Sequence, residues 1–120
     1  MYRVLTTSRN VRQLLERNDL LAMAGLSVIS PKNPEQAPAL AAQEEVDAVI
    51  IGHSDDRSVR KAIIEELRNV SPECLICFVY ATPDGGGEPL ADVSLDVTNG
   101  PEPLIRFLQD RLPRTAERAS

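Results

Sequence analysis

A histidine, a serine and two aspartates follow directly on a short apolar run, and such side chains can carry acid–base or nucleophilic chemistry. The run is Val46 to Gly52 (VDAVIIG), and the four polar residues are His53, Ser54, Asp55 and Asp56. Neighbours in sequence do not form a catalytic triad by themselves, because the three groups must converge in space. We interpret the aspartates as helix caps and the histidine as a turn residue, and we keep the histidine as a candidate for ligand binding.

The two cysteines have the C-x-x-C spacing of redox and metal-binding motifs. Cys74 and Cys77 stand in the apolar run CLICFVYA, which has the composition of a buried strand. Residues three apart in a strand point to opposite faces, so the two sulfur atoms are not expected to meet. We interpret them as buried apolar thiols and expect no disulfide, cofactor or bound metal.

Three consecutive glycines, Gly85 to Gly87, could cradle a phosphate through backbone amides, but no G-x-G-x-x-G pattern or Walker lysine accompanies them. We interpret them as part of a surface loop. The segment from Thr82 to Asp92 is too short and too rich in glycine and proline for a helix. Either the chain crosses to a parallel strand without a helix, or the last strand runs antiparallel; we favour the parallel crossover.

Strand-like and helix-like segments alternate along the chain. Strands are predicted at residues 3–6, 26–29, 46–52, 74–81 and 93–97. Helices are predicted at residues 10–24, from 33–34 or 38 to 45, from the caps at 54–58 to 70, and from 100–101 to 112. The first helix carries apolar residues at helical spacing, namely Val11, Leu14, Leu15, Leu21 and Ala22, and Gly25 is suited to end it.

This alternation predicts an α/β fold of the flavodoxin-like type: a three-layer sandwich with a five-stranded, mostly parallel sheet in the order 2-1-3-4-5. Its fourth helix is expected to be lost or replaced by the glycine-rich loop. In such sheets, sites form at the carboxyl ends of the strands beside the switch in strand order. The residues at these ends are Thr7, Ser8, Arg9, Gly52, His53, Ser54, Ala81 and Thr82.

The segments RVLTTS with VRQLL, DAVIIG, ICFVYA and LADVSLDV resemble, in order and spacing, a response-regulator receiver domain over residues 2–112. In that family the third strand ends in a phospho-accepting aspartate, and here the position holds Gly52. Ser8 and Arg9 stand where receivers place two acids that hold magnesium. Tyr80 occupies the position at the end of the fourth strand where receivers usually have Ser or Thr. Val97 lies at about the position near the end of the fifth strand where they have a lysine. The resemblance therefore implies a pseudo-receiver that lacks the phospho-acceptor and its metal site.

Two surfaces are predicted to carry function. The candidate ligand or partner site consists of Ser8, Arg9, Gly52, His53, Ser54 and Tyr80. The candidate interface consists of Val93, Leu95, Val97 and Phe107, because an edge strand beside a lost helix tends to be covered by another chain. For Phe107 an alternative stays open, in which the ring only widens the packed face of its helix.

Length and charge limit the class of protein. A chain of 120 residues with 42% apolar residues fits one domain, predicted at residues 1–112, followed by a disordered polar tail at residues 113–120. A net charge of −5 argues against binding to nucleic acid or to anionic membranes. The sequence holds no apolar stretch of 18 residues, so we expect a cytoplasmic protein.

Three functional hypotheses follow. In the first, the chain is a stand-alone pseudo-receiver in bacterial two-component or phosphorelay signalling and acts by binding a protein partner or a second copy of itself. In the second, it is a small-molecule sensor that uses the vacated pocket near Gly52 and His53. The third, an enzyme, is the weakest, because no nucleophile, base and orienting group can be placed together. We therefore expect no enzymatic activity.

Overall fold

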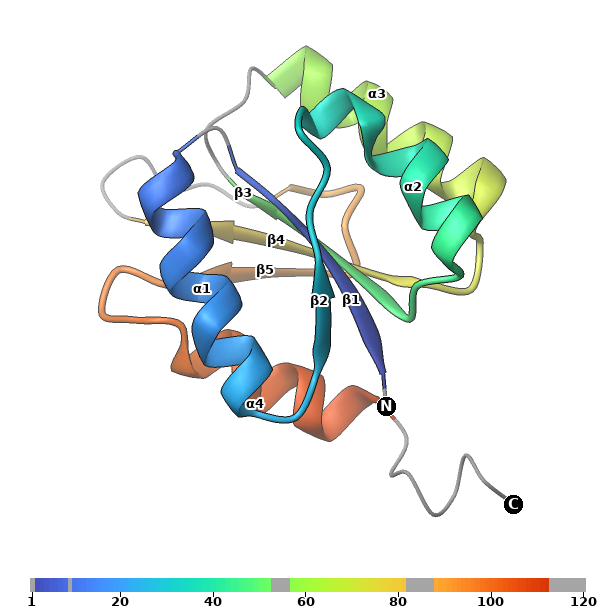
Figure 1. Cartoon of the computed structure of the whole chain (residues 1–120). Coiled ribbons are helices and arrows are strands. Elements are labelled where there is room, and N and C mark those ends of the chain that lie inside the picture. Colours follow the sequence, from blue (N-terminus) through green and yellow to red (C-terminus); the bar gives the residue numbers. More distant parts are fainter. Residues whose placement is uncertain (1, 9, 53–56, 82–87, 113–120) are drawn as a thin grey trace.

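The structure is a computed structural model that describes residues 2–8, 10–52, 57–81 and 88–112 (Figure 1). Five strands form one sheet in the order β2-β1-β3-β4-β5, and all four pairings are parallel. The strands are β1 (Arg3–Thr7), β2 (Ser27–Ile29), β3 (Ala48–Gly52), β4 (Leu75–Tyr80) and β5 (Val93–Asp96). The predicted strand order and the parallel direction of the last strand are confirmed.

Helices cover both faces of the sheet. They are α1 (Val11–Met23), the 3-10 turn η1 (Pro34–Gln36), α2 (Ala37–Glu44), α3 (Arg57–Val70) and α4 (Glu102–Arg111). Figure 1 shows α2 and α3 together on one face of the sheet, and α1 and α4 on the other. The predicted three-layer, flavodoxin-like architecture is therefore confirmed.

Local sequence explains where these helices begin and end. The Asn10 side chain accepts a hydrogen bond from the Gln13 amide at 3.1 Å and caps α1, and Gly25 follows the helix with a φ of 91°. Both predicted starts of the second helix have a counterpart, because Asn33 precedes η1 and Pro38 lies in the first turn of α2.

The core consists of two apolar clusters, one on each face of the sheet. β3 is buried along its whole length, as expected of a central parallel strand. The cluster under α2 and α3 includes Leu5, Val49, Ile51, Ile64, Leu67 and Phe78. The cluster under α1 and α4 includes Val4, Leu21, Ile50, Val79, Leu104 and Leu108.

The two cysteines belong to different clusters, as their spacing predicts. Cys74 packs under α2 and α3, and Cys77 packs under α1 and α4. Both are free thiols, and burial raises the pKa of Cys74 to about 11 and that of Cys77 to about 12. Such thiols stay protonated and unreactive near neutral pH.

The connection from β4 to β5 has no helix in its described part, residues 88–92. It is tied instead to α3, where Arg68 donates to the Asp92 carboxylate at 3.1 Å and to the Leu90 carbonyl at 3.0 Å. The predicted loss of the fourth helix is confirmed for this part. The glycines 85–87 and the predicted tail at residues 113–120 lie outside the described residues.

A buried ion pair lies under the same connection. Arg60 on α3 donates to the carboxylate of Glu88 at 3.2 Å, and both side chains are less than a tenth exposed. The Arg60 guanidinium also lies 4.5 Å from the ring centroid of Phe78 on β4, which is a cation–π contact. These contacts hold the part of the β4–β5 connection around Glu88 against the face of the sheet that α3 covers.

Candidate functional site

The carboxyl ends of β1, β3 and β4 meet at one edge of the sheet, where the sequence places the site. Thr7 pairs with Ile51, and Gly52 pairs with Val79. Ser8 lies directly beside Gly52, because a Cβ atom added at position 52 would lie 3.3 Å from the Ser8 Cβ. The structure thus brings Ser8 and Gly52 together, with Tyr80 at the end of the neighbouring strand. The predicted site residues Arg9, His53 and Ser54 lie outside the described residues.

The space above Gly52 is taken by an arginine from α1. The Arg17 guanidinium donates from Nη1 to the Thr7 carbonyl at 3.1 Å. Its Nη2 would lie 3.3 Å from a Cβ atom at position 52, and the Thr7 carbonyl oxygen would lie 3.0 Å from it. Glycine is therefore the residue that leaves room for both the guanidinium and the turn of the backbone.

Arg17 is only 9% exposed, although arginine is seldom buried unless it is paired. Burial lowers the pKa of its guanidinium to about 10, so the side chain still carries its charge at neutral pH. Of its five N–H donors, one is used in a hydrogen bond to a described residue. Within residues 2–8, 10–52, 57–81 and 88–112, no carboxylate forms an ion pair with it.

The face that α1 buries differs from the predicted one. The helix buries Arg17 and Leu21, one turn apart, and leaves Val11 and Leu15 63% and 58% exposed. Ala22 is exposed as well. The apolar spacing therefore predicted the helix and the burial of Leu21 correctly, but Val11, Leu15 and Ala22 do not face the core. The pattern of apolar residues gave no sign that Arg17, one turn before Leu21, is buried.

A polar network holds α1 in the position that buries Arg17. Asn18 on α1 accepts from the Thr6 hydroxyl and donates to the Ser30 hydroxyl at 3.0 Å. The Thr6 and Ser30 hydroxyls lie 2.9 Å apart and share a hydrogen bond. These residues join α1 to β1 and to the chain after β2, and so fix the rotation of the helix about its axis.

A cavity of about 490 Å³ lies beside Arg17, between α1, the ends of β4 and β5, and the start of α4. Its walls include Gln13, Arg17, Leu20, Tyr80, Val97 and Leu104. Tyr80 and Val97, predicted for two different surfaces, therefore line one cavity.

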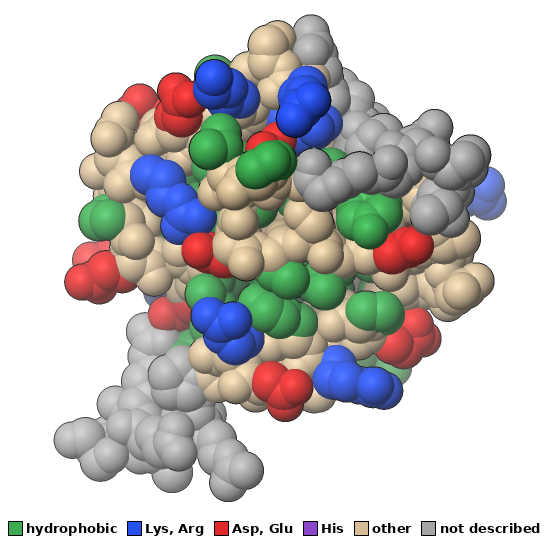
Figure 2. Space-filling model, turned by 180° about the vertical axis from the view of Figure 1, so that it is seen from behind, with side chains coloured by type: hydrophobic (Ala, Val, Ile, Leu, Met, Phe, Trp, Pro, Cys, Tyr) green, Lys and Arg blue, Asp and Glu red, His purple; other side chains and the backbone are tan. Residues whose placement is uncertain are grey.

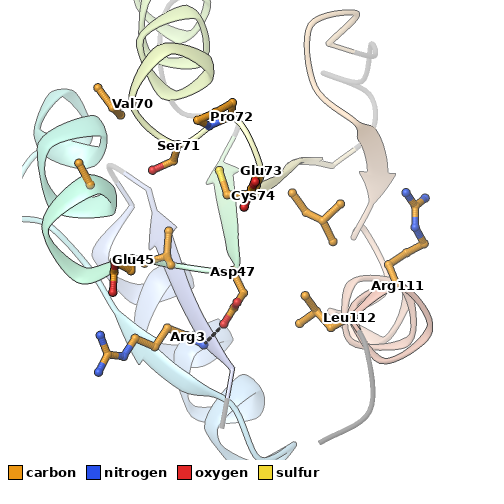
Figure 3. A pocket seen from close by; sticks show the side chains of 13 residues that line it. Arg3, Glu45, Asp47, Val70, Ser71, Pro72, Glu73, Cys74, Arg111 and Leu112 are labelled. Atoms are coloured by element: carbon orange, nitrogen blue, oxygen red, sulfur yellow. Dashed lines mark hydrogen bonds between the residues drawn. The ribbon is translucent and has the colours of Figure 1, made fainter. Parts of the chain in front are cut away.

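A larger cavity, of about 1130 Å³, lies at the opposite end of the strands (Figure 3). There the backbone amide of Arg3 donates to the Asp47 carboxylate at 2.9 Å. Figure 3 shows the charged side chains of Arg3, Glu45, Glu73 and Arg111 spread around this cavity rather than directed at one point. This arrangement lacks the convergent polar groups of a typical ligand site.

The residues of the candidate interface lie on β5 and α4. Val93, Leu95, Val97 and Phe107 are half-buried and pack against the cluster under α1 and α4. The Arg111 guanidinium lies 5.2 Å from the ring centroid of Phe107. Phe107 thus packs partly on the core and stays partly exposed, and its part in an interface remains a prediction.

Two further classes of site have no counterpart in the described part of the chain. No group of three His, Cys, Asp or Glu side chains there is placed to hold a metal ion. Among the described helices, none combines the length and the apolar character that crossing a bilayer requires.

No protein-family model matches the sequence, and no curated protein matches it. Several solved structures, in contrast, are similar to this chain. A CheY-like protein, TadZ, from Pseudomonas aeruginosa PAO1 is 19% identical, with 96% of this chain and 98% of that chain covered and a TM-score of 0.67. An orphan response regulator of H. pylori is 15% identical, with 93% and 97% covered and a TM-score of 0.73.

The pseudo-receiver domain of the CikA protein is 17% identical, with 95% of this chain and 98% of that chain covered and a TM-score of 0.64. At such identities the likeness shows the fold. With five parallel strands in the order 2-1-3-4-5 and helices on both faces, this chain has the flavodoxin-like fold of CheY-like receiver domains.

Proposed function

We propose that this chain is a receiver-like domain that accepts no phosphoryl group and acts by protein–protein interaction in bacterial signal transduction. It is not an enzyme in this proposal, and it works in the cytoplasm. One observation carries the proposal: at the end of β3 stands Gly52, with the Arg17 guanidinium packed over it. The kinds of protein that share the fold, a CheY-like protein, an orphan response regulator and a pseudo-receiver, support a role in signalling.

The chemistry at this position argues against phosphoryl transfer. Gly52 offers no side-chain oxygen, and the end of β1 offers the hydroxyl of Ser8 rather than a carboxylate. Magnesium prefers carboxylate oxygens, and the buried positive charge of Arg17 would repel it. Phosphoryl transfer depends on positioning and charge neutralisation, so the loss of acceptor and metal together removes it.

The surface formed by β5 and α4 supports an interaction role. β5 is the edge strand of the sheet, and no other described strand pairs with its outer side. Figure 2, which views the molecule from behind, shows apolar side chains gathered across the middle and lower part of this face. Leu95 and Phe107 are half-exposed and would form the apolar centre of a contact with a protein partner or with a second copy of the chain.

Intact-mass measurement tests the proposal. The protein is incubated with acetyl phosphate and millimolar magnesium, beside a receiver domain that has its aspartate as a positive control. We expect no mass gain in this chain and no stabilisation by beryllofluoride with magnesium. A stable gain of one phosphoryl group, on Asp55, Asp56 or elsewhere, would refute the proposal.

A further inference from the structure

We infer that Arg17 and the cavity beside it form a binding site for a small organic monocarboxylate with an apolar body. This inference concerns a ligand rather than a protein partner, and it stands apart from the proposed interface on β5 and α4. It names a class of ligand for the hypothesis that the chain is a small-molecule sensor.

The charge of Arg17 points to an anion. The guanidinium is buried and charged, and the described residues leave four of its five donors without a hydrogen-bond acceptor. An isolated buried charge lowers stability, and a bound anion would compensate for it. The planar guanidinium donates two parallel hydrogen bonds to a carboxylate, which makes arginine suited to this ligand.

The cavity walls point to an apolar body on that anion. Leu20, Val97 and Leu104 supply aliphatic surface next to Arg17, and Tyr80 supplies an aromatic side chain. A volume of about 490 Å³ falls within the range of small-ligand sites. Gln13 adds an amide that can donate to or accept from a second polar group on the ligand.

The charge balance of the walls favours a single negative charge. Arg17 is the only Lys or Arg among the described residues that line the cavity, and Glu16 lies on the same wall. A phosphate dianion would face one cation and one carboxylate there, whereas a monocarboxylate matches the single cation. The site is thus a poor match for inorganic phosphate.

The place of the cavity fits the general rule for such sheets. Ligands of open α/β proteins bind outside the carboxyl ends of the strands, where the order of the sheet reverses. The Thr7 carbonyl that holds Arg17 lies at the end of β1, and Val79 and Tyr80 lie at the end of β4. The rigid sheet therefore positions the guanidinium, as a preformed site requires.

Isothermal titration calorimetry and thermal shift with named probes test the inference. Benzoate and hexanoate are the expected ligands, benzamide and hexanamide are uncharged controls, and acetate and inorganic phosphate test the apolar body and the single charge. We expect benzoate or hexanoate to bind and to raise the melting temperature. The matching amide, acetate and phosphate should bind at least about tenfold more weakly.

Three variants assign the binding to Arg17. Arg17→Met should weaken carboxylate binding at least about tenfold. Leu20→Glu, one turn along α1, places a competing carboxylate at the cavity wall, keeps Arg17, and should have the same effect. Arg12→Met is the matched control, because Arg12 lies on the same helix with a side chain that is 90% exposed. It should bind as the wild type does.

The outcomes decide the inference in either direction. It is overturned if no carboxylate binds the wild type, if the amides or phosphate bind equally well, or if Arg17→Met and Leu20→Glu both leave affinity unchanged. Circular dichroism checks that each variant folds. If Arg17→Met does not fold, the effect of Leu20→Glu on carboxylate affinity decides whether the inference stands.

Discussion

The guanidinium of Arg17 lies over the bare Cα of Gly52 at the carboxyl end of β3, in space that a side chain at position 52 would need. A Cβ atom at position 52 would lie 3.3 Å from Arg17 Nη2, and Arg17 is 9% exposed. The missing side chain at the end of β3 is therefore matched by a cation from the helix that covers it.

Gly52→Asp is predicted to restore no phosphorylation. The new Cβ lies 3.0 Å from the Thr7 carbonyl oxygen, so the backbone must shift, at about 1–3 kcal/mol of stability. The new carboxylate would pair with Arg17 rather than with magnesium. Gly52→Ala isolates the steric effect, and we expect it to be less stable than Gly52→Asp in urea unfolding. Magnesium-dependent labelling of Gly52→Asp with acetyl phosphate would contradict this prediction.

Arg17→Met is predicted to stabilise the protein by about 1–3 kcal/mol, because it replaces a buried charge with an apolar side chain of similar length. Burial lowers the pKa of Arg17 to about 10, below its value of 12.5 in the unfolded chain. The charged form is thus disfavoured in the folded state at every pH below about 10, and the penalty is relieved only above it. In urea unfolding, the gain in free energy of unfolding of Arg17→Met over the wild type should be the same from about pH 5 to pH 9. A gain that varies strongly over this range would point to another cause.

The buried pair of Arg60 and Glu88 is predicted to be strongly coupled. Arg60→Met or Glu88→Leu alone leaves one buried charge and should lower the free energy of unfolding by about 3–5 kcal/mol. The double variant should lose much less free energy of unfolding than the two single variants lose together, and a double-mutant cycle measures this difference. The exposed pair Lys61 and Glu65, 3.9 Å apart, is the control, and its coupling should stay below about 1 kcal/mol. Additive losses at Arg60 and Glu88 would show that the pair does not act as a unit.

Leu95→Lys and Phe107→Ala are predicted to weaken the partner contact of the surface on β5 and α4. If the partner is a second copy, light scattering after size exclusion should show a dimer for the wild type and a monomer for both variants. Gln109→Lys, on the exposed side of α4, should behave as the wild type. Both substituted residues also pack in the core, so circular dichroism must show native folding. If all proteins stay monomeric and bind a captured partner equally well, the surface is wrongly assigned.

The sheet could be predicted because its strands are marked by composition. Val46 to Gly52 and Cys74 to Ala81 are nearly continuous apolar runs, which is typical of strands buried on both faces of a parallel sheet. The absence of a helix from residues 88–92 could also be predicted, because the segment from Thr82 to Asp92 is short and rich in glycine and proline.

The role of Arg17 could not be predicted, since a charged residue on a buried helix face runs against the pattern that identifies such a face. Its burial depends on the Thr7 carbonyl, which belongs to another element, and on Gly52, which lies far from it in sequence. The Arg60–Glu88 pair was missed for the same reason, because 28 residues separate its members and no local pattern relates them.

The ion pairs that tie residues 88–92 to α3 imply an order of assembly. Among the described strands β5 pairs with β4 alone, and Arg60 and Arg68 on α3 hold Glu88 and Asp92 in the segment that leads to β5. These contacts can form only once α3 has packed on the sheet, so β5 and α4 should add last to a nucleus of β1, β3, β4 and α3. Until they do, the face of β4 that α4 covers stays open to water, so a chain that has folded only this far exposes an apolar face to which other chains can bind.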